Sequence, residues 1–209
     1  MTIAETAEEL EALGSATLGE SGALRMHHRI KPAWKGAVVA GPAITARCGD
    51  ADNLAIHVAV AENIVVGTVL VVDATTPPEY GYWGEVLTTA AGANDIAGLV
   101  IDGGTRDTDA IAELAFPVFN ALIALTGAQK KNGGTINQAV TVGDVEVSPG
   151  DWVVGDTDGV VVIPRAQLSA VLEAAKARYD KEQDMLRQLK DGATTIELLN
   201  LDPSGLDAQ

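Results

Sequence analysis

The sequence contains little of what marks a disulfide-rich, nucleic-acid-binding or membrane protein. Its one cysteine, Cys48, excludes an internal disulfide framework and a zinc site made of several cysteines. Its 14 basic and 29 acidic residues give a formal charge of −15, which disfavours binding to nucleic acid or to an anionic membrane surface. Because no run of about 18 apolar residues is present, no membrane-spanning helix is expected.

Several familiar motifs are absent as well. There is no GxGxxG or GxxxxGK[ST] loop for a nucleotide and no GxSxG elbow for a nucleophilic serine. Residues 36–129 contain no lysine, so a Schiff-base or pyridoxal-phosphate enzyme would need an amine from outside this region. The acidic segment from Met1 to Leu13 lacks the apolar run of a signal peptide, and we expect a cytoplasmic protein.

The middle of the chain alternates between two kinds of segment. Residues 67–74, 98–102 and 117–120 are apolar runs typical of buried strands, and residues 85–95 and 107–114 have the composition of helices. This alternation predicts a parallel sheet with right-handed crossovers.

Further elements are expected on both sides of this region. They are a helix from a capping box at Thr2 and Glu5 to about Leu13, an irregular stretch over 14–36, a strand over 37–47, a short helix over 52–61 with Asp52 near its cap, short strands from Ala121 with a hairpin at Asp158-Gly159, and a long helix over 165–190 ending at Gly192. With 47% apolar and 21% charged residues, we expect one α/β domain over residues 1–209.

Two predicted strands end beside charged side chains. Because ligands of parallel sheets bind where strands end and helices begin, we expect Glu85, Asp102, Arg106 and Asp107 to share one edge. Carboxylates suit Mg²⁺, and an arginine beside helix N-termini suits a small carboxylate. Alternatively, Arg106 pairs with Asp102 or Asp107 while the other acids cap helices, and spacing alone leaves both interpretations open.

Other reactive residues are weaker candidates. His27-His28 has no acidic or histidine partner at metal-ligand spacing, and His57 stands alone on a predicted helix. Cys48 has no base nearby in sequence. We therefore favour a solvated or helix-end pair for His27-His28, a structural histidine at position 57 and a small buried residue at Cys48.

An ordered series of motifs resembles the RraA-like family, which joins 4-hydroxy-4-methyl-2-oxoglutarate and 4-carboxy-4-hydroxy-2-oxoadipate aldolases with regulators of ribonuclease E activity. Its signature is an acidic residue, twenty positions, and then Arg-Asp, as in Glu85 followed by Arg106-Asp107. Other similar stretches are Asp52-Asn53-Leu54, residues 67–73, 98–107, 116–119, 149–151 and 158–164, and a closing Glu197-Leu-Leu. The resemblance spans about residues 15–202.

The resemblance implies a single compact α/β domain with a central parallel or mixed sheet or barrel, similar to phosphohistidine swivelling domains, with N- and C-terminal helices. It implies homotrimers or homohexamers with sites at subunit interfaces, and Mg²⁺ or Mn²⁺ as cofactor. It also implies a lyase that cleaves 4-hydroxy-2-oxo acids to pyruvate and decarboxylates oxaloacetate.

The resemblance also implies roles for individual residues. Asp107 would hold the metal, Arg106 would bind the 2-oxo acid and its developing enolate, and Glu85 would orient a metal-bound water. Gly84 would allow close approach of the backbone, and the amides of Glu85, Val86 and Leu87 would hold the pyruvyl carboxylate.

Two departures from the family pattern affect these expectations. The family's site borrows acids from an adjacent subunit, and Glu20 and Glu182 are our candidates, although Glu182 equally fits a helix that has left the core. The loop from Thr75 to Trp83, with Pro77-Pro78, replaces a plainer glycine-rich loop and could change which 2-oxo acid fits.

These expectations combine into a divalent-metal-dependent class II pyruvate aldolase with oxaloacetate decarboxylase activity. Its partners would be a 2-oxo acid and further copies of the chain, with no nucleic acid or membrane. One alternative is an RraA-type protein inhibitor of ribonuclease E, and another is a related lyase or decarboxylase acting on a different 2-oxo acid.

Overall fold

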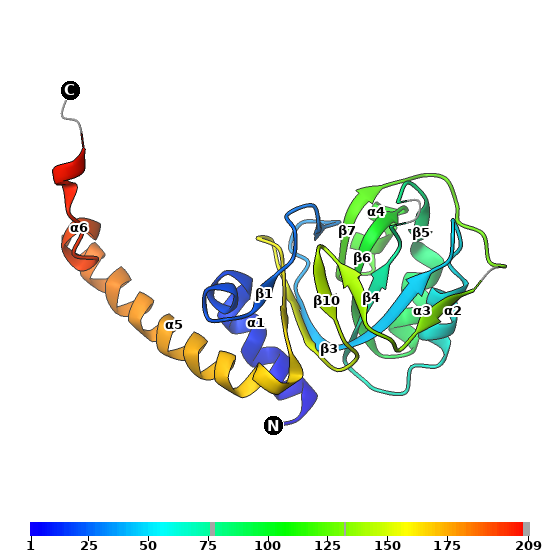
Figure 1. Ribbon diagram of the computed structural model, residues 1–209, viewed down its shortest axis with the longest axis horizontal. Helices are drawn as coiled ribbons and strands as arrows, with labels where there is room; N and C mark the ends of the chain where they lie inside the picture. Colours follow the sequence, from blue (N-terminus) through cyan, green and yellow to red (C-terminus); the bar gives the residue numbers. More distant parts are fainter. Residues whose placement is uncertain (76–77, 132, 207–209) are drawn as a thin grey trace.

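A mixed ten-stranded sheet organises the chain, and its strands run in the order β1-β12-β11-β3-β4-β6-β7-β2, with β5 beside β6 and β8 beside β3. The computed structural model describes residues 1–75, 78–131 and 133–206 (Figure 1). The strands are β1 Leu24–Arg25, β2 Lys31–Pro32, β3 Val39–Cys48, β4 Thr68–Asp73, β5 Gly81–Trp83, β6 Ile96–Thr105, β7 Val118–Ile123, β8 Gly134–Ile136, β11 Trp152–Gly155 and β12 Val160–Ile163, and a separate hairpin pairs β9 Val140–Val142 with β10 Val145–Val147.

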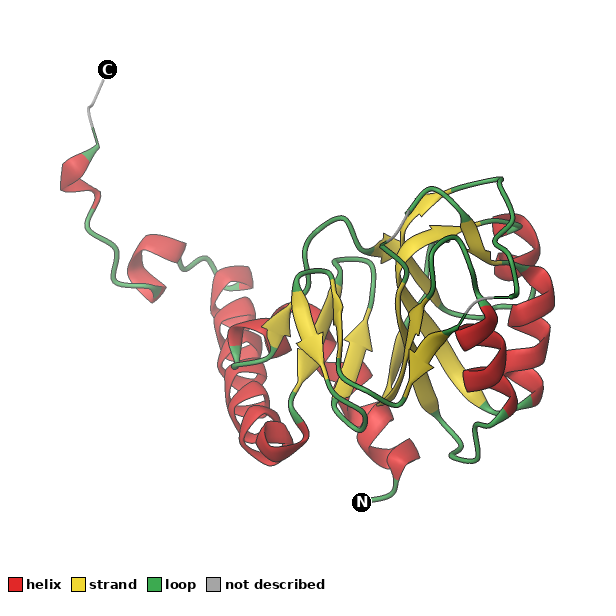
Figure 2. Ribbon diagram, turned by 45° about the vertical axis from the view of Figure 1, so that its right-hand side comes forward, coloured by secondary structure: helices red, strands yellow, loops and turns green. Residues whose placement is uncertain are grey.

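Helices cover this sheet in two groups on opposite sides of the strands (Figure 2). The helices are α1 Ile3–Glu20, α2 Leu54–Ala61, α3 Glu85–Ala93, α4 Thr108–Glu113, α5 Leu168–Lys190 and α6 Thr195–Leu198, with short 3₁₀ turns η1 Arg165–Gln167 and η2 Pro203–Gly205. None of the helices in the described part of the chain is both long and apolar enough to cross a membrane.

The predicted parallel core is present. Strands β3, β4, β6 and β7 pair in parallel, while the first part of β3 pairs antiparallel with β11. Strand β4 shows why these runs are continuously apolar, because Leu70 and Val72 pack in the cluster that includes α2 and α3 residues, and Val69 and Val71 pack toward the β9–β10 side. The expected α/β fold with a mixed sheet and terminal helices is confirmed.

The N-terminal helix is longer than predicted. The capping box of Thr2 and Glu5 is present, but the helix resumes after a kink at Gly14 and ends at Glu20. Ser15 restarts it by donating its backbone N–H and its hydroxyl to Asp156, at 2.7 and 2.6 Å. The expectation of an irregular chain from residue 14 was therefore wrong, because a distant carboxylate caps a second helical segment.

Strand β6 is also longer than the strand that we predicted over residues 98–102. It continues through Gly103 and Gly104 to Thr105, residues that we expected to form a loop. Residues 81–83 of the expected loop form β5, which pairs in parallel with this extension. Residues 76 and 77, which include Pro77 of the proposed Pro-Pro feature, lie outside the described part of the chain.

Asp102 does not lie beside the candidate catalytic residues, contrary to our expectation. Its carboxylate accepts two hydrogen bonds from the Arg29 guanidinium, at 3.0 and 2.7 Å, and one from the Gly143 amide at 2.8 Å. Arg29 also bonds Asp144, and both carboxylates raise the pKa of the guanidinium. Asp102 thus ties β6 to the β9–β10 hairpin, and it is not the partner of Arg106.

The Arg29–Asp102 pair yields a stability prediction. Arg29→Met leaves the carboxylate of Asp102, whose side chain is only 5% exposed, without its cation, and should lower the free energy of unfolding by about 3 kcal/mol. Asp144→Asn, at the exposed end of the same guanidinium, should have a much smaller effect. Urea denaturation followed by circular dichroism measures both changes, and equal effects would show that the buried carboxylate is not the reason for the loss.

Candidate active site

The turn between β6 and α4 places Arg106 and Asp107 side by side at the end of the sheet. The backbone of Asp107 has the left-handed helical conformation, with φ of 57° and ψ of 37°, which aspartate adopts more readily than most residues. The Arg106 amide donates to Trp83 O at 2.9 Å, so the turn is held against β5. The Arg106 Nε lies 3.6 Å from Asp107 Oδ2.

The Asp107 carboxylate also meets the start of α3. Its Oδ2 accepts a hydrogen bond from the Glu85 amide at 3.2 Å. The preceding residue is Gly84, where an added Cβ would lie 2.4 Å from the same oxygen. A glycine is therefore needed for the two loops to approach this closely.

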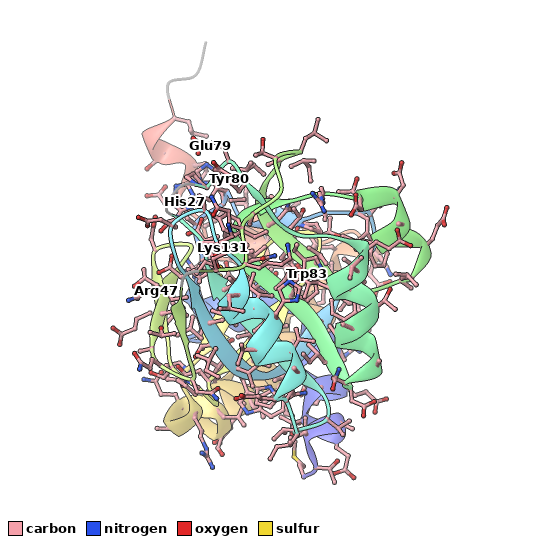
Figure 3. All side chains as sticks on the ribbon, turned by 90° about the vertical axis from the view of Figure 1, so that its right-hand side faces the viewer. His27, Arg47, Glu79, Tyr80, Trp83 and Lys131 are labelled. Carbon is pink, nitrogen blue, oxygen red and sulfur yellow. The ribbon has the colours of Figure 1, made fainter. Side chains whose placement is uncertain are left out.

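A cavity of about 160 Å³ opens at this junction. Its lining residues are Asn53, His57, Gly81, Tyr82, Trp83, Gly84, Val86, Leu87, Arg106, Asp107, Gly127, Ala128 and Lys130. The volume is smaller than the roughly 300–1,000 Å³ of typical drug-sized sites, so it suits a small organic acid. Figure 3 views this end of the domain from the side of α2 and α3, with Trp83 and Lys131 labelled.

Helix α2 contributes polar atoms that sequence reasoning assigned to structural roles or overlooked. Asn53 Oδ1 and His57 Nε2 are buried without a hydrogen-bond partner among the described residues, although both residues line the cavity. Their spacing of four residues, one helical turn, was the available signal. Unpartnered buried polar atoms at a cavity wall are suited to binding a polar ligand.

Lys130 brings a second cation to the cavity from the loop after β7. Burial lowers the pKa of His57, the Lys130 ammonium lowers it further, and Asp52 acts in the opposite direction. Gly127 of the same loop lies against Arg106, since a Cβ there would be 3.0 Å from Nη1. Burial also raises the pKa of Tyr82 to about 12, so its phenol stays protonated near neutral pH.

Most of the site residues that we predicted from the sequence line the cavity. Arg106, Asp107, Gly84, Val86 and Leu87 line it. Glu85 is exposed at the start of α3 and is not among the described lining residues, and its amide already bonds Asp107.

The proposed interface acids lie elsewhere, on α1 and α5 (Figure 1). Glu20 and Glu182 both pair with Arg178 of the same chain, and Glu182 does so at 2.8 Å. Neither is among the described residues that line the cavity.

One carboxylate is available at the cavity for a metal ion. Asp107 has a side chain 42% exposed, and no group of three or more His, Cys, Asp or Glu side chains placed to bind a metal occurs in the described part of the chain. A single carboxylate fits Mg²⁺, which keeps several waters and takes further oxygens from a substrate.

Comparison with known proteins gives consistent matches. A family model described as RraA-like, Aldolase/RraA, matches residues 6–162. A Halalkalibacterium halodurans protein, provisionally named a 4-hydroxy-4-methyl-2-oxoglutarate aldolase, is 35% identical over 175 residues, covering 84% of this chain and 83% of that protein. The structure of Streptomyces coelicolor RraAS2, described as an unusual member of the RNase ES inhibitor RraA protein family, has a TM-score of 0.75 at 28% identity and covers 88% of this chain and 98% of its own. The RNA-processing inhibitor RraA from Thermus thermophilis has a TM-score of 0.61 at 28% identity, covering 68% of this chain and 85% of its own.

The electrostatic effect of Lys130 on His57 yields a titration prediction. The pKa of His57 should lie below its ordinary value of 6.5, and Lys130→Met should raise it because a nearby positive charge is removed. Lys131→Met, which changes the adjacent lysine, is the matched control and should leave the value nearly unchanged. NMR titration of the imidazole measures all three proteins, and an unshifted His57 in Lys130→Met would contradict the assignment.

Proposed function

The chain belongs to the RraA-like family, and on that premise we propose that it is a divalent-metal-dependent aldolase that cleaves 4-hydroxy-2-oxo acids to pyruvate. The observation that most supports this proposal is the convergence of Arg106, Asp107 and the start of α3 on one small cavity. The name of the Halalkalibacterium halodurans relative supports the same reaction class, with 4-hydroxy-4-methyl-2-oxoglutarate as the first substrate to test.

The reaction needs a place for negative charge. Breaking the bond between C3 and C4 leaves the electron pair on the pyruvate fragment as an enolate, while the C4 hydroxyl loses its proton and becomes a ketone. The Arg106 guanidinium is 44% exposed and lines the cavity, where it would bind the ketone oxygen on which this charge develops. The enolate then takes a proton at C3 to give pyruvate.

The rest of the wall around Arg106 would hold the pyruvyl part of the substrate. Val86 and Leu87, in the first turn of α3, would present amides to its carboxylate. Asp107 would hold Mg²⁺ or Mn²⁺, which when bound supplies a Lewis acid for the same oxygen. In this proposal Glu85 orders the water that removes the hydroxyl proton.

The opposite wall suits the distal end of the substrate. A 4-hydroxy-2-oxo diacid carries a second carboxylate, and Lys130 offers the matching cation. Asn53 and His57 offer buried polar atoms for that carboxylate or for the C4 hydroxyl. Oxaloacetate fits the same arrangement, because loss of CO₂ from C4 leaves the same enolate.

We also propose that the protein assembles as a trimer or hexamer, as the resemblance to the family implies. Helix α5 leaves the domain, with α6 at its far end (Figure 1). An apolar stripe along α5 consists of Leu168, Leu172, Ala175, Tyr179, Leu186 and Leu189. Leu172 and Ala175 are buried near α1, but Tyr179 and Leu186 farther along are 40% and 48% exposed. Beyond α5, Leu199 is 50% exposed, so this arm would gain most by packing on another copy.

A second candidate function is inhibition of ribonuclease E, because the Thermus thermophilis protein is described as an RNA-processing inhibitor and Streptomyces coelicolor RraAS2 as an unusual member of the RNase ES inhibitor RraA protein family. This role would depend on a protein surface and not on the chemistry of the cavity. Arg106→Ala should therefore leave ribonuclease binding intact while it strongly slows the proposed reaction.

The catalytic proposal predicts a large loss on changing Arg106. Arg106→Ala should lower kcat for pyruvate release from 4-hydroxy-4-methyl-2-oxoglutarate or oxaloacetate by about 10²–10³-fold, the usual effect of removing a group that stabilises developing oxyanion charge. Arg47→Ala is the matched control, because Arg47 pairs with Asp73 and is not among the described lining residues.

Chelation tests the metal in the same assay. Treatment with EDTA should abolish pyruvate release, and added Mg²⁺ or Mn²⁺ should restore it. Activity that survives thorough chelation would contradict a metal role, and full activity in Arg106→Ala would contradict the proposed site.

The assembly proposal predicts that charge on the arm weakens association. The double variant Leu186→Glu, Leu189→Glu should lower the molar mass in solution, because it places two carboxylates on the apolar stripe. Gln188→Glu, at an exposed position beside the stripe, is the control. Light scattering coupled to size exclusion measures the mass, and a wild-type monomer or an unchanged double variant would contradict the proposal.

A further inference from the structure

Asp52 is a fully buried carboxylate to which the proposed reaction assigns no role. Its side chain is 0% exposed and lies just before α2. Oδ1 accepts a hydrogen bond from the Leu54 amide at 2.8 Å, and Oδ2 accepts one from the Lys131 amide at 2.5 Å. The two oxygens therefore hold two segments that are far apart in the sequence.

Each of these segments supplies one part of the distal wall of the cavity. Leu54 begins α2, the helix that carries Asn53 and His57 at its start and on its second turn. Lys131 follows Lys130, the cation of the loop after β7. Asp52 thus connects the segment that carries the unpartnered polar atoms to the segment that carries the positive charge at the same cavity.

Backbone hydrogen bonds also join the same two segments, next to the hydrogen bonds that the Asp52 carboxylate accepts. The Gln129 amide donates to Ala51 O at 2.7 Å, and the Asn53 amide donates to Gln129 O at 2.9 Å. At the other end of the loop, Gly81 donates to Thr126 O at 2.7 Å. The residue that follows Lys130 makes the hydrogen bond from the Lys131 amide to Asp52. This bond therefore fixes the backbone on the C-terminal side of Lys130.

A carboxylate suits this position better than a neutral side chain. Removing it from water is unfavourable unless it accepts several hydrogen bonds, and here it faces backbone N–H groups, one of them at a helix N-terminus. Its charge also acts on His57, where it opposes the lowering of the imidazole pKa by Lys130. Asp52 is therefore coupled to both groups that would meet the distal end of a substrate.

We infer that Asp52 is a positioning residue that holds Lys130 together with Asn53 and His57 in the distal wall, and so determines the preference for 2-oxo acids with a second carboxylate. The inference rests on the proposed function, because it assigns the distal wall to that carboxylate. Asp52 does not line the cavity among the described residues, so it acts through its neighbours and not by contact with the substrate.

The test compares substrates with and without the second carboxylate. Asp52→Ser keeps a cap for the α2 amide but is too short to reach Lys131, so it removes one function of the carboxylate and leaves the other. With 4-hydroxy-4-methyl-2-oxoglutarate, whose distal carboxylate keeps its charge through the cleavage, KM should rise about tenfold while kcat changes less than about threefold, the pattern of a lost binding contact made equally in ground and transition states. Exchange of the pyruvate methyl protons with deuterium in the presence of Mg²⁺ should stay near the wild-type rate, because pyruvate has no distal carboxylate.

A double-mutant cycle identifies the group through which Asp52 acts. Lys130→Met should raise KM for 4-hydroxy-4-methyl-2-oxoglutarate by a similar factor, and adding it to Asp52→Ser should give little further increase. Additive effects, or equal losses in the cleavage of this substrate and in pyruvate exchange, would overturn the inference. Should Asp52→Ser fail to fold, Asp52→Asn, which keeps the volume but presents an amide N–H₂ to one of the two donors, takes its place.

Direct binding separates failure of this inference from failure of the proposed function. Calorimetry with Mg²⁺ should show that the wild type binds 2-oxoglutarate more tightly than pyruvate, and that Asp52→Ser loses this preference. Wild-type protein that binds neither acid would overturn the proposed function and this inference together. A preference that persists in Asp52→Ser would overturn the inference alone.

Discussion

The hydrogen bond from the Glu85 amide to the Asp107 carboxylate is the contact on which the candidate site depends. It joins the start of α3 to the turn before α4, and Gly84 makes the approach sterically possible. With this contact in place, the Arg106 side chain lies against Gly81 of β5 and Gly127 of the loop after β7. The remaining features of the cavity, including its small volume, follow from how closely these backbones meet.

The electrostatics of the site contrast with those of the whole chain. The chain has a formal charge of −15, yet its cavity is lined by Arg106 and Lys130 and by the start of a helix. A small dianion would be repelled by most of the surface and attracted at this position. An anionic ligand would therefore be bound because the cavity is locally positive, and not because the protein as a whole attracts anions.

Much of the architecture could be predicted from local pattern, and the exceptions have physical reasons. The parallel core could be predicted from the buried strands, and the meeting of Arg106 and Asp107 with the start of α3 could be predicted from the motif spacing. The second segment of α1 could not be foreseen, because Asp156, more than a hundred residues away, caps it through Ser15. Asp102 was misplaced because strand alternation turns it to the opposite face, toward Arg29.

The distal wall was missed for a related reason. His57 looked isolated because Lys130 reaches it only through long-range pairing of the loop after β7 with the start of α2. A pattern of one helical turn between Asn53 and His57 was visible, but periodicity does not show which face of a helix borders a cavity.

A crystal structure of the protein soaked with magnesium and pyruvate tests the central claim most directly. The account predicts pyruvate in the cavity, with its ketone oxygen beside Arg106, its carboxylate near the amides of Val86 and Leu87, and the ion on Asp107. A cavity that stays empty at saturating concentrations, or an Arg106 side chain engaged only in an ion pair with Asp107, would contradict the enzymatic account.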